Sequence, residues 1–179
     1  MAEELHIAQG SKEERYALLY KQIAAVTENE SDTIANMANV AAMIHATFGF
    51  WWTGFYRVVG QELVLGPFQG KPACIEIAVG KGVCGTAVAQ ASPIVVPDVH
   101  EFPGHIACDS ASNSEIVLPI FKNGALFGVL DMDRPSLAYF TEDDKEIACW
   151  GEVFGVEVRT INTTRGESNI LTFSISSSI

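Results

Sequence analysis

The chain has 179 residues, of which 48% are hydrophobic and 18% are charged, so it is long enough to bury one core. Eleven Lys and Arg residues stand against 22 Asp and Glu residues, and the net charge of -11 argues against nucleic acid or an anionic membrane surface as a partner. The first residues lack the basic and apolar parts of a secretion signal, and no stretch is apolar enough to span a bilayer. We therefore expect a cytoplasmic protein whose partners are small molecules or other proteins.

Two amphipathic helices are predicted before residue 50. Ser11 and Glu14 have the spacing of a capping box, and apolar residues follow them at helical spacing. Ser31 and Asp32 mark a second helix N-terminus, and an apolar stripe runs from there to Phe48. Both helices should therefore pack one face against a core.

The middle of the chain is typical of an antiparallel sheet. Apolar and β-branched runs, separated by Gly, Pro and Asn turn residues, predict strands at 50–59, 62–65, 74–79, 93–96, 116–121 and 125–131. A short helix is expected at 86–90, and Thr141 with Asp144 should cap a last helix. This order predicts an α+β fold, with a central antiparallel sheet and helices packed mainly on one face.

We expect a single domain over residues 1–162. From Thr163 onward the chain is polar and rich in Ser, so residues 163–179 should form a poorly ordered tail.

A polar loop with one thiol is the best functional lead. Cys108 lies among small residues between Gly104 and Ser114, which would let a ligand approach backbone N–H groups, and Glu115 follows as a strand begins. In a reducing cytoplasm, any disulfide in this chain should be transient and chemical rather than structural. Four cysteines are present, namely Cys74, Cys84, Cys108 and Cys149. The thiol of Cys108 alone fits a nucleophile, a metal ligand or a buried hydrophobe.

Two binding motifs are only weakly supported. Residues 80–85 fit the G-x-G-x-x-G pattern of dinucleotide-binding loops, but the short helix after them and the antiparallel sheet do not fit a Rossmann unit. We interpret these glycines as a tight turn that delivers Cys84. A zinc site would draw on cysteines and histidines that lack the spacing of common zinc sites, so no metal is expected. These residues are Cys74, Cys84, Cys108, His100 and His105. Loop hydrogen bonding and a part in shaping a pocket both stay open for His100 and His105.

Three carboxylates are expected to cluster. Asp131 and Asp133 end an apolar strand, where alternation places both on one face and Met132 on the other. Taken alone, this pair also fits a solvated strand end, but the predicted hairpin brings Glu115 opposite it. Crowded, partly desolvated carboxylates raise at least one pKa, and an acid that keeps its proton near neutral pH can donate it. With the Cys108 thiol beside it, this acid indicates attack on an acceptor that is protonated as it reacts.

Several stretches of the sequence closely resemble the free methionine-(R)-sulfoxide reductases, which are enzymes with the GAF fold. These stretches are 66–70, 80–87, 98–100, 104–109, 112–119 and 128–133. Because separate motifs match in order over roughly residues 12–160, the resemblance is to the enzyme family and not only to the fold. It implies a GAF-like α+β domain with the active site on the sheet face away from the helices. It also implies reduction of free methionine (R)-sulfoxide to methionine, with thioredoxin as the electron donor, no cofactor, and a homodimer.

The same resemblance implies roles for individual residues. The catalytic cysteine falls on Cys108, the principal resolving cysteine on Cys74, and an additional redox cysteine on Cys84. The active-site carboxylates fall on Glu115, Asp131 and Asp133. The aromatic wall near the substrate methyl group falls on Trp52, with Tyr56 as a further candidate. Cys149 matches no redox position of the family, and we expect it to be a small buried hydrophobe.

The chemistry of the residues agrees with this mechanism. A Cys108 thiolate would attack the sulfoxide sulfur while one of the three acids protonates the leaving oxygen. The sulfenic acid that results would condense with Cys74 or Cys84 to a disulfide, and the loop around Cys108 must shift for this to happen. Backbone N–H groups of the same loop are expected to bind the substrate carboxylate. The residues are Ser110, Ser112, Asn113 and Ser114.

A hypothesis from another class is a GAF-type sensor domain that binds a small ligand without turning it over. The fold alone does not choose between a sensor and an enzyme. Three cysteines and three acids, which a passive pocket would not need, favour the enzyme.

Overall fold

Two helices open the fold in the computed structural model, which describes residues 4–106 and 108–147. They are α1 (Lys12–Thr27) and α2 (Thr33–Phe48). The predicted capping box is confirmed, because the Ser11 side chain accepts from the Glu14 backbone N–H and the Glu14 carboxylate accepts from the Ser11 N–H. Asp32 caps α2 by accepting from two backbone N–H groups of its first turn.

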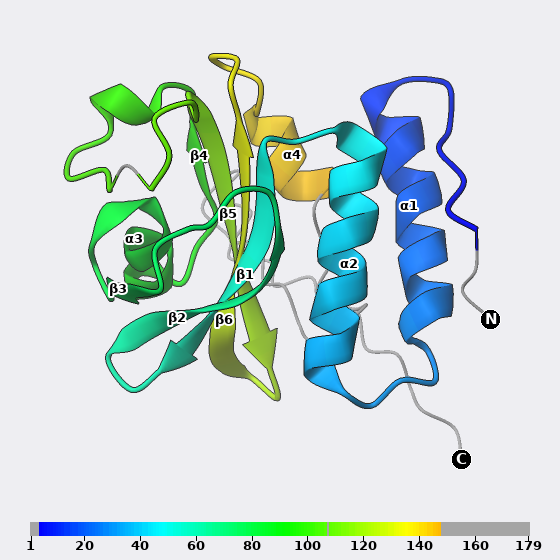
Figure 1. Ribbon diagram of the computed structural model, residues 1–179, viewed down its shortest axis with the longest axis horizontal. Coiled ribbons are helices and arrows are strands. Elements are labelled where there is room, and N and C mark those ends of the chain that lie inside the picture. The colour runs from blue at the N-terminus through cyan, green and yellow to red at the C-terminus, as the bar shows by residue number, and fades with distance from the viewer. Residues whose placement is uncertain (1–3, 107, 148–179) are drawn as a thin grey trace, which may run out of the picture.

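A six-stranded antiparallel sheet forms the centre of the molecule (Figure 1). Its strands are β1 (Trp52–Val59), β2 (Glu62–Gln69), β3 (Glu76–Ala78), β4 (Ile94–Val96), β5 (Ser114–Lys122) and β6 (Ala125–Arg134). They lie in the order β3-β2-β1-β6-β5-β4, and each neighbouring pair is antiparallel. The predicted α+β class with an antiparallel sheet is confirmed.

The helices are divided between the two faces of the sheet. Figure 1 shows α1 and α2 side by side on one face, and α3 (Gly82–Gln90) on the opposite side of the sheet. A short 3-10 helix, η1 (Val99–Glu101), and the final described helix, α4 (Glu142–Ile147), complete the elements. None of the helices in the described part of the chain is long and apolar enough to cross a membrane.

Alternate residues of β5 and β6 lie on opposite faces of the sheet, in two different environments. One set is buried in a hydrophobic cluster with α1 and α2, and we call this side of the sheet the helix face. It includes Ile116, Leu118, Leu130 and Met132. The other set lies on the α3 side, which we call the site face. It includes Glu115, Val117, Val129, Asp131 and Asp133. Polar side chains are therefore concentrated on one face of two neighbouring strands.

Strand β2 is longer than the predicted 62–65, because it continues through Gly66 and Pro67 to Gln69. The β1–β2 register shifts there, since Gly54 pairs with Phe68 but Tyr56 pairs with Leu65. Over this stretch β2 has one more residue than β1, and the extra residue forms a bulge. Pro67 also lies beyond the stretch of β2 that pairs with β3, so its missing N–H interrupts no bond between those strands.

Strand β3 is shorter than predicted, and α3 is longer. The predicted strand began at residue 74, but regular pairing with β2 begins at Glu76, and Ile75 is 70% exposed. The glycines of residues 80–85 do not all form a turn, because α3 already begins at Gly82. A side chain on Gly85 would lie 2.4 Å from the Ala78 carbonyl oxygen, so this glycine permits close packing of α3 on the end of β3.

The C-terminal part of the last predicted helix, Cys149 and the tail at 163–179 lie outside the described residues.

Candidate active site

A cavity opens on the site face between the sheet, α3 and two loops. It holds about 620 Å³ of space, counted out to its open mouth. Its lining combines aromatic and apolar side chains with a few carboxyl and thiol groups, which is typical of a small-molecule site. Most of the predicted site residues line it. They are Trp52, Tyr56, Cys84, Cys108, Ser112, Glu115, Asp131 and Asp133.

The pairing of β5 with β6 brings the three carboxyl groups together. Glu115 lies opposite Asp133, and Val117 lies opposite Asp131. Met132, between the two aspartates, is buried on the helix face. The alternation and the hairpin register predicted from the sequence are thus confirmed, and they place three acids within one cavity.

These acids are buried, which makes ionisation costly. Glu115 is 6% exposed and Asp131 is 7% exposed. Burial, followed by the neighbouring carboxylates, raises the pKa of Glu115 well above its usual value. The pKa of Asp131 is raised by burial and by the charge of Asp133. One oxygen of Glu115 and one of Asp131 lie within 4.8 Å of each other, so two negative charges at these positions would repel strongly.

Asp133 is the most easily ionised of the three. Burial raises its pKa to about 6, although a hydrogen bond donated by the Ser112 hydroxyl lowers the pKa and the charge of Asp109 raises it. Around neutral pH the site therefore combines an acid poised to ionise with two that hold protons more tightly.

Cys84 is a buried, protonated thiol at the floor of the cavity. Its Sγ donates to Asp131 Oδ2 at 3.3 Å. Burial and then the charges of Asp131 and Glu115 raise the pKa of Cys84 well above its ordinary value, so its thiolate is disfavoured. Within the described residues, Cys84, Glu115 and Asp131 are the one group whose potential ligand atoms lie close enough for a metal ion, within 4.8 Å of one another. The two histidines and the other two cysteines considered for zinc do not belong to this group.

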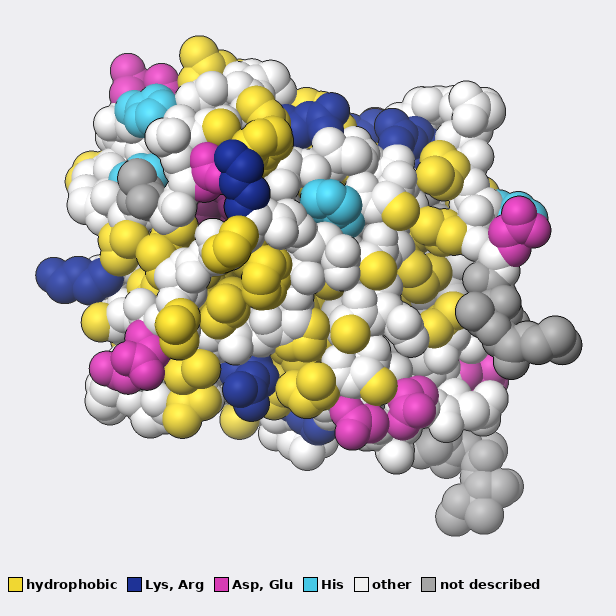
Figure 2. Space-filling model, viewed as in Figure 1, with side chains coloured by type: hydrophobic (Ala, Val, Ile, Leu, Met, Phe, Trp, Pro, Cys, Tyr) yellow, Lys and Arg dark blue, Asp and Glu magenta, His cyan; other side chains and the backbone are white. Residues whose placement is uncertain are grey.

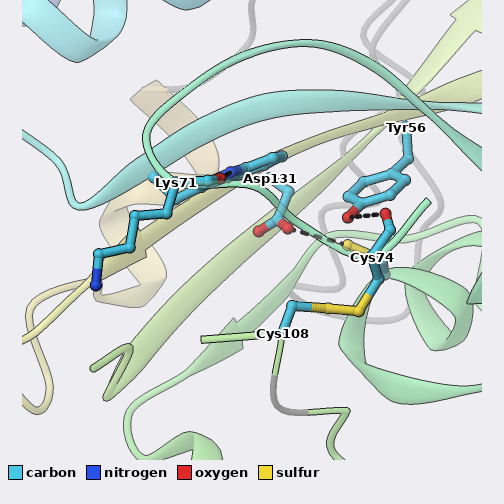
Figure 3. The surroundings of a disulfide bond; sticks show 7 residues. Tyr56, Lys71, Cys74, Cys108 and Asp131 are labelled. Atoms are coloured by element: carbon cyan, nitrogen blue, oxygen red, sulfur yellow. Dashed lines mark hydrogen bonds between the residues drawn. A yellow bond between two sulfur atoms is a disulfide. The ribbon is translucent and has the colours of Figure 1, made fainter. Parts of the chain in front are cut away.

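Cys74 and Cys108 form a disulfide at the mouth of the cavity (Figure 3). Cys108 is exposed, whereas Cys74 is half-buried against the hydrophobic cluster on the α3 side. The Tyr56 hydroxyl donates to the backbone oxygen of Cys74 at 3.0 Å, which holds this half of the disulfide against β1. The two cysteine residues of the disulfide therefore differ in their exposure to solvent.

A clamp joins the two loops that carry these cysteines. Lys71 Nζ lies 3.3 Å from Asp109 Oδ2 and 4.5 Å from the ring centroid of Trp51. The backbone oxygen of Lys71 also accepts from Trp52 Nε1 at 3.1 Å. Lys71 and Asp109 were missed in the sequence, although the position of Asp109 directly after Cys108 was a usable signal.

An aromatic wall forms one side of the cavity. Trp52 stacks on Tyr56, with ring centroids 5.9 Å apart, and on Phe68, with centroids 5.5 Å apart. A side chain on Gly54 would lie 2.4 Å from the Trp52 ring, so this glycine leaves the space that the indole occupies. The aromatic residues predicted for the wall therefore both lie at the cavity.

Only one of the four predicted loop residues reaches the cavity. Ser112 lines it, and the Ser112 hydroxyl donates to Asp133. The backbone N–H of Asn113 donates to the Arg134 oxygen at 2.8 Å and is thus occupied. The Ser114 hydroxyl donates to the Ser136 oxygen at 2.7 Å, and Ser110 is exposed outside the lining.

The two histidines of the loop have different surroundings. His105 lines the cavity, where burial and the nearby His100 lower the pKa of His105. His100 lies outside the lining and shares a 2.9 Å hydrogen bond with the Asn113 side chain. The structure thus assigns the pocket-shaping position to His105 and the loop-bonding position to His100.

Comparison with known proteins gives the family. Residues 32–150 match the model of the GAF domain. The chain is 47% identical to a free methionine-R-sulfoxide reductase of Escherichia coli over 76% of this chain and 83% of that protein. It is 53% identical to GAF domain-containing protein A of Dictyostelium discoideum over 82% of this chain and 93% of that protein.

A solved structure shows the same fold. The free methionine-R-sulfoxide reductase of Neisseria meningitidis, in complex with its substrate, superposes with a TM-score of 0.82 and 44% identity. The alignment covers 85% of this chain and 93% of that one. The chain therefore belongs to the free methionine-R-sulfoxide reductase family of GAF-domain proteins.

Proposed function

We propose that this protein reduces free methionine (R)-sulfoxide to methionine, with Cys108 as the nucleophile and Cys74 as the resolving cysteine. The observation that carries this proposal is the position of a Cys74–Cys108 disulfide at the mouth of a cavity that also holds three carboxyl groups, two of them buried. Sulfoxide reduction needs both parts, a pair of thiols as the source of electrons and an acid as the source of a proton. Family membership supports the choice of substrate.

The proposed reaction has two steps on the enzyme. The Cys108 thiolate attacks the sulfoxide sulfur, an acid protonates the oxygen, and methionine leaves as oxygen passes to Cys108 as a sulfenic acid. The Cys74 thiol then attacks that sulfenic sulfur, which forms the disulfide and releases water. The sulfoxide gains two electrons, and the two thiols lose them.

The acid in the first step comes from the carboxyl cluster. Glu115 and Asp131 hold their protons most tightly because they are the most deeply buried, so either is suited to donate one. Asp133 ionises more readily and is suited to face the positive ammonium group of the substrate. This division lets one cluster supply both a proton and a negative charge.

The same cluster accounts for selection of the free amino acid. A free methionine sulfoxide carries an ammonium group, whereas the corresponding nitrogen of a protein-bound residue is an uncharged amide. A cation placed among buried carboxyl groups recovers interaction energy that an amide cannot supply. The stacked Trp52 and Tyr56 rings supply an apolar wall for the substrate methyl group.

Cys84 has a secondary place in this scheme. Its raised pKa makes it a poor nucleophile in the first step, but its bond to Asp131 places it within the same cluster. We assign it the role of an additional redox cysteine that acts after Cys108 has been oxidised.

Recycling completes the proposed cycle. A thioredoxin donates two electrons to the disulfide, which restores two thiols and leaves thioredoxin oxidised. We therefore propose a cytoplasmic location, because thioredoxin is kept reduced there. We further propose that the protein is a homodimer, which sedimentation of the full chain will test.

The function is tested by coupled turnover. The full chain is incubated with free methionine (R)-sulfoxide, thioredoxin, thioredoxin reductase and NADPH, and NADPH oxidation is followed together with methionine formation. Stereospecific turnover is expected, and the (S) epimer should react far more slowly. Binding of the sulfoxide with no methionine formed would instead support the GAF-type sensor.

A further inference from the structure

Two exposed aliphatic side chains flank the disulfide. Ile75 follows Cys74 directly and is 70% exposed, the highest value among the large hydrophobic residues that the structure describes as exposed. Ile106, which is 39% exposed, contributes the backbone oxygen that accepts from the Cys108 N–H at 3.0 Å. Figure 2 shows that hydrophobic side chains gather on the side of the molecule that carries β2 and β3. We call Ile75, Ile106 and Cys108 the disulfide surface.

Neither isoleucine has a structural role that explains its exposure. The backbone oxygen of Ile75 accepts from the Leu65 N–H at 2.9 Å, but its side chain does not join the inward face that Ile77 occupies. Ile106 lines the cavity beside Gly82 of α3, but its side chain is still 39% exposed. Single exposed aliphatic residues are normal in proteins, but two of them beside an oxidised disulfide are consistent with a docking site.

The chemistry of the disulfide identifies the class of partner. To act again, the oxidised enzyme needs two electrons from outside. Cys84 is the one free cysteine in the described part of the chain, and a single thiol can only exchange a disulfide for another one, so it does not supply two electrons. A small molecule could reach the disulfide without any surface, whereas a protein must cover apolar area around it to bind. Weak redox encounters between proteins use small interfaces, so docking of this kind needs few apolar side chains around the disulfide.

We infer that a dithiol protein docks on the disulfide surface and attacks the sulfur of Cys108 rather than that of Cys74. This inference rests on the proposed function. Cys108 is exposed, whereas Cys74 is half-buried and held by Tyr56. Access to the sulfur is one determinant of which atom a thiolate attacks.

The electron balance follows from that choice. A partner thiolate attacks Cys108 Sγ, the Cys74–Cys108 bond breaks, and Cys74 leaves as a thiolate that takes up a proton. The second partner thiolate then attacks the partner's own sulfur in the mixed disulfide and releases Cys108 as a thiolate. The partner ends as a disulfide, and the enzyme ends as a dithiol with its nucleophile already ionised.

One further consequence is that substrate and partner exclude each other. Cys108 also lines the cavity, so a protein bound over its sulfur closes the cavity mouth. Methionine must therefore leave before the partner docks, and the kinetics should be ping-pong. High sulfoxide concentrations should compete with thioredoxin.

The test uses Ile75→Ser, because Ile75 lies outside the cavity lining. The matched control is Leu137→Ser, which removes a 59% exposed aliphatic residue from the loop after β6. For Ile75→Ser, the KM for thioredoxin should rise about tenfold, while turnover with dithiothreitol stays at the wild-type rate. Leu137→Ser should change neither value.

The attacked sulfur is identified by trapping. Oxidised full-length chain is mixed with a thioredoxin whose second active-site cysteine is serine, and the mixed disulfide is mapped by peptide mass spectrometry. Linkage to Cys108 is expected, and linkage to Cys74 would overturn the assignment. An unchanged thioredoxin KM for Ile75→Ser, or an equal rise for Leu137→Ser, would overturn the docking surface.

Two further outcomes would overturn either the proposed function or the identity of the partner. If the wild type forms no methionine even with dithiothreitol, the proposed function itself fails. If Ile75→Ser converts a dimer to a monomer in sedimentation, the surface belongs to a second copy of this chain, and the docking assignment is wrong.

Discussion

The two faces of β5 and β6 show how one hairpin serves stability and chemistry at once. On the helix face, Leu118 and Met132 are buried with α1 and α2 among apolar side chains. On the site face, Asp131 is buried and the neighbouring Asp133 is half-buried, and the pKa values of both are raised. Burial lowers the free energy of the fold on the first face and raises that of the ionised acids on the second. The helix face therefore compensates for the unfavourable burial on the site face.

The largest expected effect on turnover comes from replacing the two cysteines at the mouth of the site. Cys108→Ser should reduce turnover below detection, because it removes the nucleophile. Cys74→Ser should still form about one methionine per chain in a burst and then recycle poorly, because it removes only the resolving thiol. Rapid-quench measurement of methionine checks both. A normal steady-state rate for Cys108→Ser would remove this residue from its role.

Replacement of an acid on the site face should separate activity from stability. Asp131→Asn should lower turnover by about 10²–10⁴-fold, which is the range for loss of acid–base catalysis. Its free energy of unfolding should stay equal or rise, because one member of a buried, mutually repelling cluster is lost. Asp143→Asn, in the exposed first turn of α4, is the control and should change neither quantity. Loss of stability in Asp131→Asn would contradict the division between the faces.

A substitution that leaves a cavity on the helix face should lower stability and leave activity nearly unchanged. Leu118→Ala should cost about 2–5 kcal/mol of unfolding free energy, because Leu118 is fully buried. Turnover per folded molecule should change by no more than a few-fold. Urea denaturation followed by fluorescence measures the first quantity, and Leu137→Ala is the exposed control. If turnover collapses while the fold is retained, the two faces are not independent.

The pH dependence of stability should reveal the cost of the acids. Since the pKa of Asp133 is raised in the folded state to about 6, its stabilising contribution is full below its unfolded pKa of about 4 and is lost as pH rises through about 6. Over this window the contribution falls by up to about 3 kcal/mol. Asp133→Asn should flatten the decline of unfolding free energy with pH. Parallel curves for the wild type and the variant would contradict the shift.

The smallest expected effect concerns the clamp between the two cysteine loops. The Lys71–Asp109 pair is partly exposed, so Lys71→Met should lower the stability of the disulfide form only slightly. The difference should disappear at high ionic strength, because salt screens exposed charges. Lys71→Arg serves as the control that keeps the charge. A larger loss that is insensitive to salt would mean that packing on Trp51, and not the ion pair, holds the loops together.

The local patterns of the sequence were sufficient for much of the fold. The capping box of Ser11 and Glu14 depends on residues within one helical turn, and the structure contains it. The meeting of Glu115 with Asp133 depends only on strand alternation and one hairpin, and the register agrees with it. Features set by neighbours in the chain could therefore be predicted.

Features that depend on contacts with distant parts of the chain could not be predicted from the sequence. Gly85 is needed because α3 packs on the Ala78 carbonyl, a contact that no local pattern encodes. Pro67 lies in a strand because its part of β2 lies beyond the pairing with β3. The Asn113 N–H is taken up by Arg134 on β6, so it is not free for a ligand. In each case the deciding partner lies elsewhere in the chain.

A single turnover of the reduced chain tests directly whether Cys74 and Cys108 supply the electrons that reduce the sulfoxide. Reduced full-length protein, freed of excess reductant, is mixed with free methionine (R)-sulfoxide, and methionine and the cysteine pairs are measured in the same sample. About one methionine per chain is expected, formed together with a Cys74–Cys108 disulfide. Methionine without that disulfide, or no methionine from a chain whose Cys74 and Cys108 are both free thiols, would contradict it.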